Sequence, residues 1–183
     1  MKKSIIVMMV LLFSAAFVTA APPNPHTFVP NRAAKPSIVL AKYMRANISG
    51  GIRNFIFVWN RSYDNPTLQV ADMMKIFDTL SNSPVLPKQM LENQEFQLYR
   101  LLDTKKMLKA LDRYQKTLKT GFRSLFEYSS LIVGTKDGSM NKAYKKMNRD
   151  MKKVVKSYNH LAKVTNKQYG QNIMPYYELN YKK

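Results

Sequence analysis

Apolar residues recur at helical spacing along most of the chain. From Ile38 to Trp59 they fall three and four residues apart, which predicts a first helix with Ser37, just after Pro36, as its cap. Gly50-Gly51 lies within this pattern. Each glycine costs about 1 kcal/mol against alanine in a helix, so the pair marks either a break or a place where another helix packs closely.

The same periodicity predicts the later helices. Asn65-Pro66 is a typical helix start, and the helix that follows ends near Ser81. Residues 88–128 form the longest periodic run and predict one long helix or two in series, with Gly121 as a candidate break. Ser139 follows a turn at residues 134–138 and caps a further helix. No segment alternates like a strand, so we expect an all-α, single-domain bundle of about five helices.

The N-terminal region differs from this pattern. Residues 1–20 carry two lysines directly after Met1, continue with an apolar run and end in small residues, which predicts a signal peptide and a secreted protein. The alternative is a retained membrane anchor, for which the apolar run is short. Residues 21–36 contain five prolines and predict an extended arm. The helical domain is expected over residues 37–183.

Composition argues against catalysis. The 183 residues carry a formal charge of +19, two histidines and no cysteine. Thiolate metal sites and thiol nucleophiles are therefore excluded, and packing alone must hold the fold. No motif joins His26 or His160 to a serine. Glu92 and Glu95 are three residues apart on a predicted helix, and offsetting the charge of nearby lysines explains the pair better than acid–base chemistry does. We expect no enzyme, no cofactor and no metal site.

One stretch of helix is strongly basic, and only Asp150 opposes its charge. Like charges three and four residues apart repel one another, and an anionic partner would relieve this repulsion. The alternative is an ordinary solvated helix face. The residues expected to bind an anionic surface, called the basic face below, are Lys142, Lys145, Lys146, Arg149, Lys152, Lys153 and Lys156.

Three partners suit such a charge: nucleic acid, an anionic membrane and an acidic glycoprotein coat. Secretion argues against nucleic acid, as does the position of the aromatic residues on apolar faces, away from the lysines. Basic amphipathic helices bind anionic lipid at membrane interfaces. We therefore favour the membrane, with the glycoprotein as the alternative.

Residues 52–59 are among the most apolar after the signal segment. A buried core is the expected explanation, but Phe55, Phe57 and Trp59 would form a membrane-insertion or self-association patch if they were exposed, and a homodimer is then a further candidate. Asn47 and Asn60 each begin a sequence pattern for N-glycosylation.

Several segments resemble the acrosomal sperm proteins of abalone and related marine snails. These segments are the run from Val39 to Lys42 that leads through Gly50-Gly51 to Trp59, the start of the helix at Thr67–Val70, and residues 171–180, which are similar to the C-terminal segment of that family. They occur in the same order in a basic, cysteine-free chain behind a signal peptide.

The resemblance implies a five-helix bundle stored in the sperm acrosomal vesicle and released at fertilisation, with a non-enzymatic mechanism. Members of that family include an egg lysin, which opens the vitelline envelope by binding its glycoprotein, and a paralogue that promotes fusion of the sperm with the egg plasma membrane. The tyrosine- and phenylalanine-rich helices suit the fusion-promoting member. We therefore expect membrane fusion as the function and envelope dissolution as the alternative. A third hypothesis is a basic antimicrobial protein.

Overall fold

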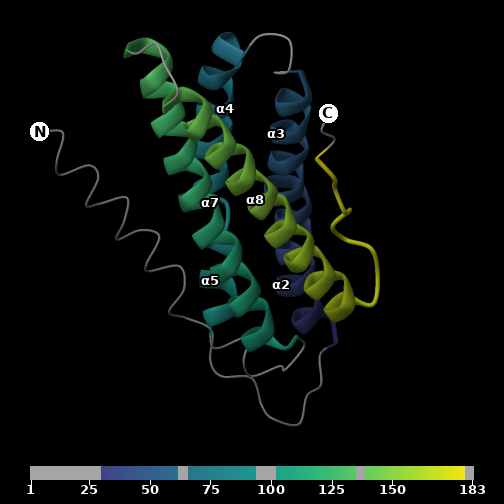
Figure 1. The fold of residues 1–183 in the computed structure, drawn as a ribbon. Helices are drawn as coiled ribbons and strands as arrows, with labels where there is room; N and C mark the ends of the chain where they lie inside the picture. Colours follow the sequence, from purple (N-terminus) through teal and green to yellow (C-terminus); the bar gives the residue numbers. More distant parts are fainter. Residues whose placement is uncertain (1–29, 62–65, 94–101, 135–138, 180–183) are drawn as a thin grey trace, which may run out of the picture. The chain divides into compact units, whose positions relative to one another are not determined.

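The computed structural model describes residues 30–61, 66–93, 102–134 and 139–179. The regular structure within these ranges is helical, and no strand occurs in them (Figure 1). From Arg32 on, the described helices belong to one compact unit. The expected all-α, single-domain bundle is therefore confirmed. The expected signal peptide and residues 21–29 of the arm lie outside the described ranges.

The first helical rod begins earlier than expected. Helix α2 (Pro30–Tyr43) continues into a π-helix, η1 (Met44–Ser49), and then into α3 (Gly50–Arg61). The expected start at Ser37 is wrong, because residues 30–36 of the arm are already helical. Pro30 occupies the first helical position, where a missing N–H costs nothing. Pro36 lies inside α2, so the helix continues although one backbone hydrogen bond is lost there.

The π-helix has a visible cause in the sequence. Leu40, Met44, Ile48 and Ile52 follow one another at intervals of four residues, and all four are fully buried. In an α-helix of 3.6 residues per turn, each such step would rotate the side chain by about 40°. The wider turn of a π-helix offsets this drift. The Gly50 N–H donates to the Arg45 carbonyl oxygen, five residues back, as that wider turn requires.

Helix α4 (Pro66–Asn82) begins and ends close to the expected positions and packs against α3. Gly51 is the point of closest approach. A Cβ atom placed there would lie 2.5 Å from Cδ2 and 3.2 Å from Cγ of Leu80, which is buried. Of the two explanations for the glycine pair, close packing of another helix is therefore correct.

The long run expected over residues 88–128 is divided. Helix α5 (Val85–Glu92) has Pro87 in its first turn, and α7 (Thr104–Gly134) begins separately. Helix α7 continues through Gly121 without a break. A Cβ atom at Gly121 would lie 2.9 Å from Cγ2 of Val154 and 3.2 Å from Cε1 of Phe77, so this glycine also admits neighbouring helices.

Helix α8 (Ser139–Tyr169) starts at the expected residue and lies beside α7 along much of its length (Figure 1). The core joins this pair to α3 and α4. The Tyr114 and Tyr158 rings meet edge to face across α7 and α8, and Phe55 and Phe77 do so across α3 and α4. The Tyr169 hydroxyl donates to the Ser37 carbonyl oxygen, which ties the end of α8 to α2.

The chain reverses at Gly170, whose φ of 64° is the left-handed conformation that favours glycine. Residues 171–179, the C-terminal segment, then run back without regular structure (Figure 1). Two asparagines of α8 fix this segment. Asn159 bonds both the N–H and the carbonyl oxygen of Tyr177, and Asn166 does the same for Met174.

The two adjacent glycines allow a matched test of the packing. Gly51→Ala should lower the free energy of unfolding by about 1–2 kcal/mol, because the cost of overpacking against Leu80 exceeds the gain in helix propensity. Gly50→Ala should raise it by up to about 1 kcal/mol, since no side chain lies within 4 Å of the added carbon. Urea denaturation followed by circular dichroism measures both. If both alanines raised the free energy of unfolding, α4 would be able to shift away from Gly51, and the close packing would not require a glycine there.

Candidate anionic-surface site on α7 and α8

All seven residues of the basic face are exposed, as a partner-binding surface requires. Helix α8 carries nine Lys and Arg residues against one acidic residue, Asp150. These cations lie opposite the stripe of Met147, Met151, Val154 and Tyr158, which is buried. Helix α8 is therefore amphipathic, with all nine of its cations on the solvent side.

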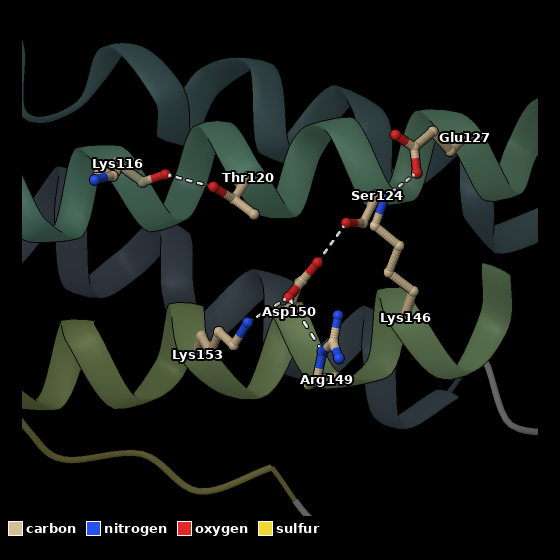
Figure 2. A network of polar contacts seen from close by, with 8 residues as sticks. All are labelled: Lys116, Thr120, Ser124, Glu127, Lys146, Arg149, Asp150 and Lys153. Carbon is tan, nitrogen blue, oxygen red and sulfur yellow. Dashed lines mark hydrogen bonds and ion pairs between the residues drawn. The ribbon is translucent and has the colours of Figure 1, made fainter. Parts of the chain in front are cut away.

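Asp150 does not share the exposed face, although it neighbours Arg149. Its side chain is only 4% exposed and points toward α7 (Figure 2). The Ser124 hydroxyl donates to Oδ2 at 2.6 Å, and the Lys153 ammonium donates to Oδ1 at 2.9 Å. Burial raises the pKa of Asp150, but the hydrogen bonds from Ser124 and Lys153 and the nearby positive charges outweigh it and lower the pKa below its ordinary value.

The cations of the basic face differ in how far they are neutralised. Lys153 and Arg149 share Asp150, and Lys146 lies 2.5 Å from Glu127 of α7 (Figure 2). Lys142, Lys145 and Lys156 form no ion pair with any carboxylate of the described residues. These three are the cations most available to an anionic partner.

Helix α7 extends the positive charge. It carries seven Lys and Arg residues against Asp112 and Glu127. Lys116, Lys119 and Arg123 are all exposed. The positive surface is therefore a property of both long helices.

A largely apolar groove lies where α7 ends and α8 begins. This tip groove has a volume of about 520 Å³. Its walls are Phe126, Ser130 and Leu131 of α7 with Ser139 and Ala143 of α8, and the charged residues Glu127, Lys142 and Lys146 also line it. Phe126 is 54% exposed, and Met140 and Tyr144 in the first turns of α8 are also exposed. An apolar hollow thus adjoins one end of the basic face.

Only one of the three aromatic residues proposed for insertion, Phe57, is exposed. Phe55 and Trp59 are buried in the core, so their assignment to an insertion patch is wrong. Phe55 faces α4, as its ring contact with Phe77 shows, and Trp59 packs against Phe55. Phe57 is 59% exposed, and the Arg61 guanidinium lies 5.2 Å from its ring centroid.

The two asparagines that begin the glycosylation patterns lie on helices. Asn47 is in η1, where its amide donates to the Tyr43 carbonyl oxygen, and Asn60 is in the last turn of α3. Both side chains are exposed.

Of the four residues considered for catalysis, the structure describes two, and these lie on different helices. His160 is exposed on α8 and Glu92 ends α5, while His26 and Glu95 lie outside the described ranges. In the part of the chain that the structure describes, no group of His, Asp and Glu side chains could hold a metal ion. Within the same part, no helix combines the length and apolar character needed to cross a membrane.

The tip groove was not foreseen from the sequence. One sequence feature could have indicated it. Phe126 directly follows Leu125, which belongs to the apolar stripe of the helix, so Phe126 itself lies off that stripe. Comparisons with protein-family models, curated proteins and solved structures gave no match. The function must therefore be argued from these surfaces.

The buried carboxylate leads to a test of stability against pH. Because the pKa of Asp150 is below the ordinary 3.8, its contribution to stability is present above that value and is lost as the pH falls through the lowered pKa. Asp150→Asn should lower the free energy of unfolding by about 1–3 kcal/mol near neutral pH. The difference from the parent protein should shrink below about pH 4.

Asp112→Asn is the matched control, measured by the same urea denaturation series. Asp112 also pairs with a lysine, Lys88, but its side chain is 60% exposed, so the loss should stay below about 1 kcal/mol. Equal losses in both variants would contradict a special role for the buried carboxylate.

Proposed function

We propose that this protein binds anionic membrane surfaces through the basic face and the tip groove, and that it acts without catalysis. One observation carries the proposal: an apolar hollow with an exposed Phe126 lies directly beside Lys142 and Lys146. Cations adjoining exposed apolar side chains are what an interface of headgroups and acyl chains attracts. Lysines would bind headgroups while Phe126 enters the apolar boundary.

The expected binding free energies support electrostatic attraction to the membrane followed by shallow insertion of Phe126. Each cation near an anionic surface contributes about 1 kcal/mol, so Lys142, Lys145 and Lys156 together supply about 3 kcal/mol. Burying one phenylalanine adds about 1.5–3 kcal/mol. These terms give reversible binding at the surface.

The biological setting that we propose is fertilisation. In this setting the protein is secreted from the sperm acrosomal vesicle and promotes fusion with the egg plasma membrane. The resemblance to the acrosomal sperm proteins and the expected signal peptide support it, together with the exposed aromatic residues. A fusion-promoting protein needs no catalytic site, because binding and disturbing the bilayer is its action.

Envelope dissolution remains a second candidate, favoured by one observation. The basic face lies on a helix of 31 residues, about 46 Å long, which suits an extended acidic glycoprotein. This hypothesis expects stoichiometric dissolution of isolated vitelline envelopes. Lipid mixing and envelope dissolution, assayed on one protein sample, would separate the two functions.

Neutralising the unpaired cations tests the electrostatic part. The variant Lys142→Gln, Lys145→Gln, Lys156→Gln should bind vesicles containing anionic lipid about 100-fold more weakly, from three lost contributions of about 1 kcal/mol. Vesicle sedimentation measures the binding. A triple variant with the same loss of charge elsewhere, Lys42→Gln, Arg53→Gln, Lys75→Gln, should lose less than about fivefold. Equal losses would mean that net charge alone drives binding.

Removing the aromatic wall tests insertion. Phe126→Ser should weaken vesicle binding about tenfold and reduce lipid mixing, because a phenylalanine no longer enters the bilayer. Phe57→Ser is the control, since Phe57 is just as exposed but lies on α3 beneath Arg61. It should leave both measurements close to those of the parent protein. Unchanged lipid mixing by Phe126→Ser would remove the tip groove from the mechanism.

A further inference from the structure

A second basic hollow lies away from the α7–α8 tip. This cationic groove, of about 680 Å³, is formed between the η1–α3 rod and the C-terminal segment. Lys42, Arg45 and Arg53 line one side, and Asn172, Pro175 and Tyr177 line the other. Its volume is in the range of small-molecule sites.

The charge of the cationic groove is uncompensated. Lys42, Arg45 and Arg53 are exposed, and no acidic residue lines the groove. None of the three forms an ion pair with a carboxylate of the described ranges. Two guanidinium groups present the planar pairs of donors that match sulfate, phosphate or carboxylate oxygens.

The π-helix brings the two arginines to one side of the rod. Arg45 and Arg53 are eight residues apart, which in an α-helix would separate them by about 80° around the axis. The wider turn of η1, which contains Arg45, reduces this angle. The distortion that keeps the core residues in line therefore also gathers the cations.

The opposite wall has a donor that is set in position by its neighbour. Asn166 donates from Nδ2 to Asn172 Oδ1 at 2.9 Å and accepts from the backbone N–H groups of Ile173 and Met174. Because the Asn172 oxygen is turned toward Asn166, its amide NH₂ group is left to donate to a ligand.

The cationic groove also has a fixed base. Tyr158 Oη lies 2.8 Å from the Pro175 carbonyl oxygen and 2.9 Å from Ser49 Oγ. The carbonyl can only accept, so the single tyrosine proton goes to Pro175 and the Ser49 hydroxyl donates to Tyr158. Burial raises the pKa of Tyr158 above its ordinary value of 10.0, so the hydroxyl that links the two walls also keeps its proton in mildly alkaline solution.

We propose that the cationic groove binds an anionic saccharide, with a sulfate or carboxylate group held by Arg45 and Arg53. Lys42 adds charge, and the Asn172 amide donates to a hydroxyl or ring oxygen. Pro175 and Tyr177, which line the groove, supply apolar contacts for a sugar ring. This combination of oxyanion donors, an amide and ring walls in a preformed hollow suits a carbohydrate. The site is independent of the proposed membrane function.

Calorimetry of the full-length protein with a short, sulfated oligosaccharide tests the proposal. The variant Arg45→Gln, Arg53→Gln should bind a heparin-derived tetrasaccharide about 100-fold more weakly, about tenfold for each arginine. Asn172→Ala should lose about fivefold. The matched control, Lys145→Gln, Lys156→Gln, removes the same charge from α8 and should lose less than about threefold.

Two further comparisons separate saccharide binding from general attraction of anions. The desulfated tetrasaccharide should bind at least tenfold more weakly than the sulfated one, and the arginine variant should still bind anionic vesicles like the parent protein. Equal weakening by the arginine and lysine pairs would overturn the proposal in favour of general attraction of polyanions. Loss of vesicle binding with unchanged saccharide binding would overturn it in favour of a lipid headgroup.

Discussion

The packing of α7 against α8 is the contact on which the rest of the molecule depends. Each helix has 31 residues, and each places a continuous apolar stripe against the other. Tyr114 and Tyr158 fill the seam between them. Without cysteine, this burial has to hold the pair together. Because the stripes face inward, the lysines and arginines of both helices are left on the outer surface, so the charge distribution is a consequence of the core.

The energies explain how such a surface persists. A like-charge pair one helical turn apart costs about 0.2–0.5 kcal/mol, whereas one buried Leu or Phe contributes about 1.5–3 kcal/mol. The core therefore tolerates several repulsive pairs. Asp150 reduces the repulsion from within by pairing with Lys153 and Arg149 from a buried position. An anionic partner would relieve the repulsion that remains. The same unpaired cations therefore destabilise the free helix and attract the partner.

Periodicity predicted the features that depend on one helix at a time. It located the start of α4 and of α8, and it placed all seven cations of the basic face on the solvent side. It failed where a proline was treated as a boundary, because Pro36, placed before the first helix, lies within α2. It also could not find the cationic groove, since Arg45 and Asn172 meet only after the C-terminal segment folds back. Sites built from distant segments leave no local pattern.

The π-helix η1 has a consequence for how related chains would be compared. Removing one residue from an α-helix rotates everything beyond it by about 100° relative to what precedes it. In a loop, a difference of one residue in length changes little. Between Met44 and Ser49 it would instead restore ordinary winding and leave Ile52 and Phe55 facing the core, because the six residues of the π-helix turn the chain about as far as five residues of an α-helix. An alignment gap of one residue in this short segment would therefore mark the loss of the π-helix with the same residues still facing the core.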